Sequence, residues 1–516
     1  MTDRSESTPP PGTYRPLTVG TGMRATALHS PDKVALIEGD RRLTFARFVE
    51  RADRLSGLLD GLALPDRCTV AILAPNCIEY IEVVVGASEA GHAVTTLNPK
   101  LTAREIGAIC DDCGARLMFV HPSLEELARA VPFVEPPMMV VLGEAYEDAL
   151  TAARPRPPRL GLQEWDTFSL PYTSGTTGKP KGVMLPHRSR VMAFFGMASE
   201  FGCYGPDDEY LAIAPLFHGA GLCFAMGSIY FGGTCEILPR FEPEAVIAKL
   251  GVKTGTFMVP THFNALFALE PTLLERAKTH RLRTIVSNAA PLPQVMKERI
   301  VGLWGEGILH EVYGSTEGGN VTNLRPRYQL VKERCVGKPF PCTQVRLLGE
   351  DGREVLPGEV GELFSNSPYL FNGYHGKPAE TAAALRDGWF SAGDLARRDE
   401  EGFLYLVDRK KDLIITGGVN VYPREIEEVL FRHPALADVA VIGEPDAHWG
   451  ESVCAIVVPK AGSVPDPDEV AAFCKADLAG FKTPRRVIVR QEPLPRNAAG
   501  KVLKGELRTY AAETRP

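Results

Sequence analysis

Short β-rich runs and amphipathic helical stretches alternate along the first part of this chain, from Lys33 to about Leu142. Between the runs VALIEG and TVAILAP, apolar side chains recur three or four residues apart, which places them on one face of a helix. These positions are Phe45, Phe48, Val49, Ala52, Leu55, Leu59 and Leu62. Because strands separated by helices pair in parallel and are covered by those helices, the pattern predicts an α/β fold with parallel sheets.

The rest of the chain predicts further domains. A second alternating block runs from roughly Glu209 to Pro326, and a strand-rich block with many turn glycines follows to about Asp408. The last hundred or so residues form their own set of helices and strands, which is enough for a small α+β domain. We therefore expect a flexible arm over residues 1–17, a large N-terminal domain of mixed and parallel sheets with a β-rich subdomain over 18–410, and a small mobile C-terminal domain over 411–516. A length of 516 residues agrees with several domains.

Composition narrows the possible partners and location. Charged residues make up 23% of the chain and the net charge is −7, which gives no general attraction to nucleic acid or to an anionic membrane. No apolar run reaches the roughly 18 residues of a membrane-spanning helix, and the first 17 residues do not resemble a secretory signal. Eleven cysteines without a regular spacing favour reduced thiols in the cytoplasm. We expect a cytoplasmic monomer or homodimer with no nucleic-acid or integral-membrane partner.

The one close pair of cysteines, Cys110 and Cys113, lies in the segment CDDC. A zinc site would need two further ligands at a matching spacing, and none is evident. We interpret the two cysteines as helix-end residues.

The segment PYTSGTTGKPKG, residues 171–182, has the chemistry of an anion-binding loop. Its glycines let backbone N–H groups approach phosphate oxygens, its hydroxyls donate hydrogen bonds, and Lys179 and Lys181 offset negative charge. It differs from the Walker loop, because Gly175 and Gly178 are only three residues apart and Pro180 follows the lysine. Loops of this composition can be simple turns, but a turn has little use for two lysines. The segment therefore predicts phosphate binding.

This loop resembles the signature of the adenylate-forming superfamily, which comprises acyl-CoA synthetases, adenylation domains of peptide synthetases and firefly-type luciferases. Other segments resemble the same family in the same order: LFHGAG (216–221), YGSTEGG (313–319), DGWFSAGDLA (387–396) with DRKKDLIITGGVNVYPREIE (408–427), and PRNAAGKVLK (495–504). The resemblance extends over nearly the whole chain. It implies that the substrates are a small-molecule carboxylic acid and ATP with Mg²⁺, and, in the acyl-CoA branch, coenzyme A.

The resemblance also implies which residues bind the nucleotide. Tyr313 would stack on adenine, and Asp394 would accept hydrogen bonds from the ribose hydroxyls, which suits a carboxylate. Glu317 and Thr177 would hold Mg²⁺, a cation that prefers oxygen ligands, although a Thr-Glu pair by itself is more often a helix cap. The full implied set for ATP or AMP is Thr173, Ser174, Gly175, Thr176, Thr177, Gly178, Lys181, Asn288, Ala289, Ala290, Tyr313, Gly314, Thr316, Asp394, Arg409 and Lys501.

The implied catalytic residues are Lys501, His218 and Thr316. The carboxylate and the α-phosphate repel each other, and an ammonium group bridging both would stabilise the transition state. Most lysines are simply exposed to solvent, so this role for Lys501 rests on the family pattern. Lys411 matches the residue about which the small domain turns. His218 could gate the acyl channel or orient the carboxylate, although on chemistry alone a core histidine is nearly as common.

The acid and the acyl acceptor are less constrained. The implied acyl pocket comprises Phe217, His218, Asn288, Val312 and Gly318. Asn288 stands where many relatives carry glycine, and Val312 stands where plant coumarate ligases often carry glycine, which argues against a slim, flat aryl pocket like theirs. The pattern HExYGSTEG is closer to fatty-acid and steroid-type bacterial ligases. The apolar residues around Phe217, Phe224 and Met226 favour a hydrophobic acid, although such runs are more often ordinary core.

No aspartate for an amino group stands near Phe217, which disfavours amino acids. No insertion follows the hinge, unlike in fatty acyl-AMP ligases, which favours coenzyme A. Gly417, Gly418 and Asn420 match residues that border its tunnel in relatives, whereas Ile415 replaces a lysine of plant relatives. The prediction is an AMP-forming acid:CoA ligase for a hydrophobic fatty, aryl or polycyclic acid. The alternatives are an acyl-AMP ligase serving a carrier protein, a luciferase-like oxygenase, and a non-catalytic acyl-nucleotide sensor.

Overall fold

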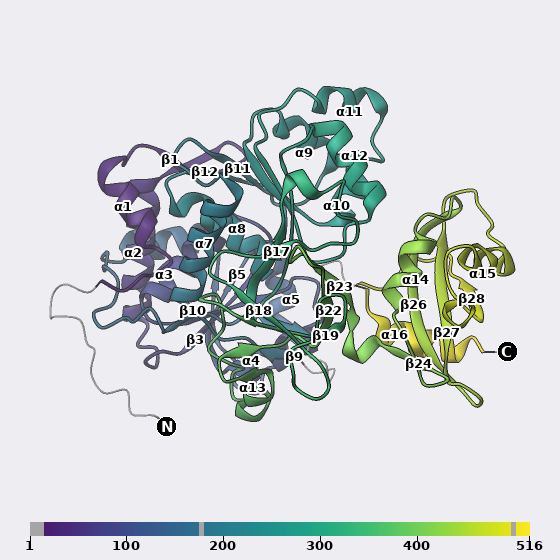
Figure 1. The fold of residues 1–516 in the computed structure, drawn as a ribbon. Coiled ribbons are helices and arrows are strands. Elements are labelled where there is room, and N and C mark those ends of the chain that lie inside the picture. The colour runs from purple at the N-terminus through teal and green to yellow at the C-terminus, as the bar shows by residue number, and fades with distance from the viewer. Residues whose placement is uncertain (1–14, 175–179, 497–501, 516) are drawn as a thin grey trace. The chain divides into compact units, whose positions relative to one another are not determined.

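A computed structural model describes residues 15–174, 180–496 and 502–515 (Figure 1). Over these residues the chain divides into two compact units. The first unit holds the chain up to Ala198, then Tyr204–Arg240 and Pro368–Pro378. The second unit holds Ser199–Cys203, Phe241–Ser367 and the chain from Ala379 onward. Of the predicted arm, residues 1–14 lie outside the described residues; just after it, Thr18 is buried and its hydroxyl donates a hydrogen bond to Glu89 at 2.7 Å.

The first unit contains a sheet with the strand order β10, β7, β4, β3, β5, β6. The strands are β10 (Leu185–Pro186), β7 (Thr167–Ser169), β4 (Ala93–Leu97), β3 (Thr69–Leu73), β5 (Ala115–Val120) and β6 (Met138–Val141). β3 pairs in parallel with both β4 and β5. Every residue of β3 is buried, as expected for a parallel strand covered on both faces. The parallel pairing predicted from the alternating pattern is confirmed.

The helices of the first unit follow from the apolar spacing of the sequence. α2 (Phe45–Gly61) buries Phe45, Phe48, Ala52, Leu55 and Leu59, as predicted, while Val49 is half-buried. The cap of α4 (Ala103–Cys113) is a capping box in which Thr102 and Glu105 bond each other's backbone. The other helices are α1 (Thr21–His29), α3 (Ile78–Glu89), α5 (Glu125–Arg129), α6 (Glu144–Ala152), α7 (His187–Phe201) and α8 (Gly219–Tyr230).

Another group of strands in the first unit joins parts of the chain that are far apart in sequence. β1 (Val34–Glu38) pairs in parallel with β12 (Thr234–Ile237), which in turn pairs in parallel with β11 (Glu209–Ala212). β2 (Arg41–Thr44) forms an antiparallel hairpin with β1. The alternating pattern predicted β1 as a strand, but it could not show that β1 pairs with β12 rather than β3, because periodicity carries no information on strand partners.

The second unit begins with strands in the order β13, β14, β15, β16, β17. β13 (Gly255–Met258), β14 (Thr284–Ser287) and β15 (Leu309–Ser315) are parallel, and β16 (Gly319–Leu324) returns antiparallel to β15 beside β17 (Lys338–Pro339). α9 (Pro243–Leu250) precedes β13, and α10 (Pro260–Leu266), α11 (Pro271–Ala277) and α12 (Gln294–Trp304) connect the parallel strands.

The predicted strand-rich block is an antiparallel sheet within the second unit. Its strands are β18 (Gln344–Leu348), β19 (Val360–Asn366), β20 (Leu385–Arg386), β21 (Trp389–Phe390), β22 (Asp394–Arg398) and β23 (Leu404–Arg409), and α13 (Pro378–Ala384) precedes β20. β22 and β23 pair directly, with Asp394 opposite Arg409.

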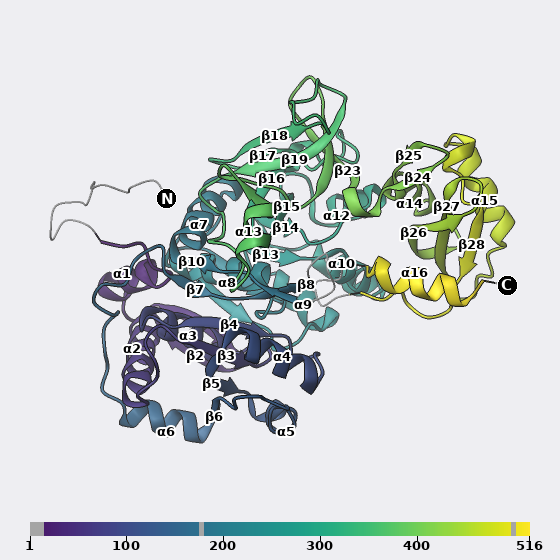
Figure 2. The ribbon, with the colours of Figure 1, turned by 90° about the horizontal axis from the view of Figure 1, so that it is seen from below.

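The C-terminal part of the second unit is an α+β layer structure (Figure 2). Its elements are β24 (Ile414–Thr416), β25 (Val419–Val421), α14 (Pro423–Leu430), β26 (Leu436–Asp446), β27 (Gly450–Pro459), α15 (Pro467–Lys475), β28 (Arg486–Val489) and α16 (Lys504–Glu513). Alternate residues of β26 and β27 face α14 and α15 on one side and α16 on the other. The predicted fold class, a large mixed α/β domain with a small α+β C-terminal domain, is confirmed. The boundary at residues 410 and 411 stays a prediction.

Candidate active site

The predicted phosphate-binding segment begins and ends in a short hairpin of the first unit. β8 (Tyr172–Ser174) pairs antiparallel with β9 (Pro180–Gly182), with Thr173 opposite Lys181. The predicted ligands Gly175, Thr176, Thr177 and Gly178 lie outside the described residues, as does the side chain of Ser174. The described part of the segment is therefore the pair of strands on either side of these residues.

Contacts from two segments, α4 and residues 374–377, hold this hairpin. The Tyr172 hydroxyl donates a hydrogen bond to Asp112 at 2.6 Å, and the Lys377 ammonium pairs with the same carboxylate at 3.1 Å. Lys181 places its ammonium 5.0 Å from the ring centre of Tyr374, a cation–π distance. Asp112, Lys377 and Tyr374 were not predicted as site residues. The sequence gives little signal for them, because each lies far from residues 171–182 along the chain.

The segment LFHGAG leads into α8, whose first three residues are its last three, and buried polar side chains hold its backbone. Asn76 accepts a hydrogen bond from the Leu216 N–H at 2.7 Å, and the Thr96 hydroxyl donates to the Phe217 carbonyl at 3.0 Å. Burial lowers the pKa of His218, so at neutral pH the imidazole is uncharged and can donate or accept one hydrogen bond. Phe224 and Met226 are fully buried in α8, which makes them core residues of the first unit.

In the second unit, YGSTEGG forms the hairpin between β15 and β16. Thr316 and Glu317 occupy its turn and are half-buried, so their function is not the helix cap that a Thr-Glu pair usually provides. Gly314 is required by a close backbone approach, since a Cβ there would lie 2.1 Å from the Gly319 carbonyl oxygen. At Gly318 a Cβ would crowd the ring of Phe390 at 3.1 Å. The turn therefore presents Thr316 and Glu317 on a tightly packed base.

Three predicted nucleotide residues meet in the second unit. The Tyr313 hydroxyl donates to Asp394 Oδ2 at 2.6 Å, and Arg409 Nε pairs with Asp394 Oδ1 at 3.1 Å. Asp394 is 7% exposed, and it stands opposite Arg409 on neighbouring strands. Burial, and then the nearby Asp394 charge, raise the pKa of Tyr313 well above its usual value, which keeps its hydroxyl a donor. The arrangement fixes a carboxylate whose remaining lone pairs can accept ligand hydroxyls.

The predicted nucleotide residues Asn288, Ala289 and Ala290 follow β14 and are half-buried. Ala289 has a φ of 76°, a left-handed backbone conformation that is uncommon outside glycine. Strain of this kind clusters at functional sites. On the adjacent β15, Val312 is 3% exposed, and Glu311 forms a buried ion pair with Lys297 of α12 at 2.5 Å.

The predicted hinge and coenzyme A residues lie at the start of the C-terminal part. Lys411 is exposed within a short 3₁₀ turn over Lys410–Asp412. Gly417 and Gly418, with φ values of 57° and 78°, make the turn between β24 and β25, as a two-residue hairpin requires. Asn420 is exposed opposite Ile415.

Lys501, the predicted catalytic cation, lies outside the described residues, as do residues 497–500. Arg496 and Val502, the described residues that flank this gap, form an antiparallel bridge. Arg496 also pairs with Asp438 of β26 at 2.7 Å, which ties the base of this segment to the C-terminal sheet.

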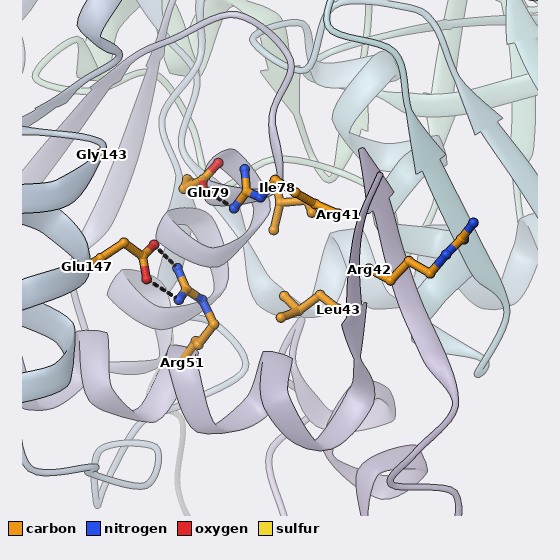
Figure 3. Close-up of a pocket in the computed structure, with 8 residues that line it drawn as sticks. All are labelled: Arg41, Arg42, Leu43, Arg51, Ile78, Glu79, Gly143 and Glu147. Atoms are coloured by element: carbon orange, nitrogen blue, oxygen red, sulfur yellow. Dashed lines mark hydrogen bonds and ion pairs between the residues drawn. The ribbon is translucent and has the colours of Figure 1, made fainter. Parts of the chain in front are cut away.

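A separate cavity of about 430 Å³ opens in the first unit (Figure 3). Arg51 points into it and pairs with Glu147 at 2.6 Å, and it also pairs with the buried Glu82. Arg41, on the same rim, pairs with Glu79. None of the predicted site residues lines this cavity. Carboxylates of the chain already neutralise Arg41 and Arg51. We therefore interpret the charged lining of this cavity as a structural ion-pair network and not as a ligand site.

Two features are absent from the residues that the structure describes. No group of three or more His, Cys, Asp or Glu side chains there is placed to hold a metal ion. Within the same residues, no helix has the length and apolar character needed to cross a membrane.

Matches to known proteins cover nearly the whole chain. The family profile described as AMP-binding enzyme matches residues 23–375, and that described as AMP-binding enzyme C-terminal domain matches residues 425–501. A feruloyl-CoA synthase of Amycolatopsis sp is 36% identical over 484 residues, covering 93% of this chain and 96% of that protein. The fatty acid–[acyl-carrier-protein] ligase ScoC of Streptomyces coeruleorubidus is 33% identical over 497 residues, covering 93% of this chain and 94% of that protein. The crystal structure of ATP-bound MatB from Rhodopseudomonas palustris matches with a TM-score of 0.88 at 30% identity, covering 96% and 100%.

Proposed function

The chain belongs to the AMP-binding enzyme family, and we propose that it joins a hydrophobic carboxylic acid to coenzyme A at the expense of ATP. In the first step a carboxylate oxygen attacks the α-phosphorus of ATP, which gives the acyl-AMP and releases pyrophosphate. In the second step the thiol attacks the acyl carbon, which forms the thioester and releases AMP. The adenylate is itself the activated species, so no nucleophilic side chain of the protein is needed.

The observation that carries this proposal is the cluster of Tyr313, Asp394 and Arg409. A buried carboxylate flanked by an aromatic hydroxyl and a guanidinium suits a ribose beside a purine. The Tyr313 ring offers an apolar face for the adenine, and Arg409 offers a positive charge for the ribose or the phosphate. All three side chains belong to the second unit and are brought together by direct strand pairing and one hydrogen bond.

The remaining roles in the adenylation step follow from the chemistry of each group. Lys181 and the hydroxyls of the phosphate-binding segment would neutralise the triphosphate. Lys501 would bridge the carboxylate and the α-phosphate, where negative charge accumulates in the transition state. His218, held uncharged by burial, would orient the acid without adding a second cation. Rotation about Lys411 would then withdraw Lys501 and admit the thiol.

Mg²⁺ fits the donors that the chain offers. The Glu317 carboxylate stands on the β15–β16 turn, and Mg²⁺ is commonly held by one or two protein oxygens together with substrate phosphates and water. Thr177, the second predicted ligand, lies outside the described residues. When bound with ATP, the cation would neutralise the phosphate oxygens and stabilise the leaving pyrophosphate.

Coenzyme A is favoured over a carrier protein by the compact hinge. The 3₁₀ turn at Lys410–Asp412 leads directly into β24, which leaves no insertion between hinge and hairpin. The relative ScoC is named for a carrier-protein product, so acylation of a carrier is the second candidate. The names feruloyl-CoA synthase and fatty acid ligase span aryl and alkyl acids. The buried Val312 and the half-buried Asn288 fill space, which argues against a slim, flat aryl pocket.

Pyrophosphate release tests this function directly. We would screen fatty, aryl, polycyclic and amino acids with MgATP, each with and without coenzyme A, and identify products by mass spectrometry. We expect acyl-AMP as the product without coenzyme A and acyl-CoA as the product with it. An Asp394→Ala variant, which we expect to be inactive, serves as the control. Adenylate formation without any acyl-CoA would favour a carrier protein. No ATP binding and no pyrophosphate release with every acid would refute the proposal.

A further inference from the structure

The CDDC segment at the end of α4 contacts the β8–β9 hairpin (the phosphate-loop hairpin) through a carboxylate and not through its thiols. Burial raises the pKa of Cys113 to about 12, and it raises the pKa of Cys110 as well. Both thiols are therefore protonated and unreactive at neutral pH. Asp112, between them, instead uses both of its carboxylate oxygens. Oδ2 accepts from the Tyr172 hydroxyl at 2.6 Å, and Oδ1 accepts from the Lys377 ammonium at 3.1 Å.

Tyr172 is the first residue of the hairpin, so its position sets where β8 begins. Its ring packs directly on the last residue of β9, since a Cβ at Gly182 would lie 3.0 Å from the Tyr172 ring carbon Cζ. The two residues also face each other in the strand register. Fixing the Tyr172 hydroxyl therefore holds the open end of the hairpin, where β8 begins and β9 ends, relative to α4.

The segment that carries Lys377 holds the other side of the hairpin. The His375 N–H donates to the Gly182 carbonyl at 2.9 Å, and the Met184 N–H donates to the Gly373 carbonyl at 3.0 Å. Tyr374 of the same segment lies beneath the Lys181 ammonium. Asp112 thus contacts both Tyr172 of the hairpin and Lys377 of the segment that supports it.

The energetic contribution of these contacts to folding is modest. The side chains of Asp112 and Lys377 are 35% and 23% exposed, and ion pairs of that exposure add little to stability. A hydrogen bond from a hydroxyl to a carboxylate is, however, short and directional. The contacts are therefore better suited to orienting the hairpin than to stabilising the unit.

We propose that Asp112 is a positioning residue that orients the phosphate-loop hairpin for the triphosphate of ATP. This inference rests on the proposed function, because the triphosphate is the ligand that this function assigns to the loop. It predicts a defect limited to the first half-reaction. Acyl-AMP has no β- or γ-phosphate, so thioester formation from supplied acyl-AMP does not need the oriented hairpin.

The test compares Asp112→Ala and Tyr172→Phe with Asp111→Ala in the full-length protein. Asp111 lies on the same helix turn and accepts a hydrogen bond from the Val134 N–H, so its substitution controls for general disturbance of the end of α4. We expect the KM for ATP in pyrophosphate release to rise about three- to tenfold in both test variants, from the loss of a charge-assisted hydrogen bond. The KM for the acid and the rate of thioester formation from acyl-AMP should stay within twofold of wild type.

The double variant Asp112→Ala/Tyr172→Phe provides a second readout. Its KM for ATP should match that of the worse single variant, because the second substitution removes a contact that is already lost. A KM for ATP in the double variant that rises by the product of the two single effects would overturn the inference. An unchanged KM for ATP in the single variants would also overturn it. So would an equal loss of rate in both half-reactions together with a lowered thermal unfolding midpoint. A wild-type protein that releases no pyrophosphate with any acid would instead defeat the proposed function.

Discussion

The Asp394 carboxylate is held from two sides, by the Tyr313 hydroxyl at 2.6 Å and by Arg409 Nε at 3.1 Å. Tyr313 comes from the β15–β16 hairpin, and Arg409 comes from the end of β23, directly before the predicted hinge. The nucleotide cluster is therefore attached to the segment about which the C-terminal part is proposed to turn. A change in the position of Arg409 would alter its ion pair with Asp394.

Replacing Tyr313 with Phe tests the hydrogen bond while retaining the aromatic ring. We expect the KM for ATP to rise about three- to tenfold with a smaller change in kcat, since a hydrogen bond to a charged group is lost and stacking is kept. Steady-state pyrophosphate release would measure both constants. Tyr405→Phe is the matched control, because Tyr405 donates a similar bond to Asp399 at 2.9 Å outside this cluster. Equal effects in the two variants would contradict the assignment.

Substitution of Lys501 by Ala should separate the two half-reactions. We expect acyl-adenylate formation to fall by about a hundredfold or more, because an electrostatic group that acts in the transition state is lost. Thioester formation from supplied acyl-AMP should change little. Lys475→Ala, at an exposed position of α15, controls for the loss of a surface charge. A similar loss in both half-reactions would argue against the predicted role.

Breaking the buried ion pair between Lys297 and Glu311 should lower the free energy of unfolding. Their side chains are 2% and 7% exposed, so Lys297→Met would leave a buried carboxylate without its cation, at a cost of about 3–5 kcal/mol in the free energy of unfolding. Urea denaturation would measure this cost. The double variant Lys297→Met/Glu311→Leu should recover most of the loss, and a double variant as unstable as the sum of the two single variants would show that the charges do not interact.

The free energy of unfolding should fall as the pH is lowered from about 6.5 to about 4. Burial lowers the pKa of His187, His262 and His310 from 6.5 to about 4. In that interval the unfolded chain binds protons that the folded chain does not, so each histidine reduces stability by up to about 1.4 kcal/mol per pH unit. Urea midpoints at pH 7 and pH 5 would show the effect. His262→Phe, which keeps the ring contact with Phe241, should make the decline shallower, and an unchanged slope would contradict the assignment.

Much of the fold followed from local sequence patterns. The apolar spacing of α2, the runs of β3, β4 and β5, and the elements of the C-terminal part are all properties of consecutive residues, which is why periodicity predicts them. The pairing of β1 with β12 was not predictable in this way, because their partnership depends on how distant segments pack. The predicted phosphate-binding segment, residues 171–182, could be picked out because its glycines, hydroxyls and lysines are contiguous.

The sequence alone determined that the chain carries a glycine-, hydroxyl- and lysine-rich segment predicted to bind phosphate, the Tyr313 and Asp394 motifs and a C-terminal lysine in a family order. Each of these is a short run whose chemistry is local. Only the tertiary structure decided that Asp394 stands opposite Arg409, that Asp112 reaches both Tyr172 and Lys377, and that Phe224 and Met226 are core. These relationships join residues tens to hundreds of positions apart. A hydrogen bond depends on distance in space, and the order of residues along the chain does not specify that distance until the sheets are assembled.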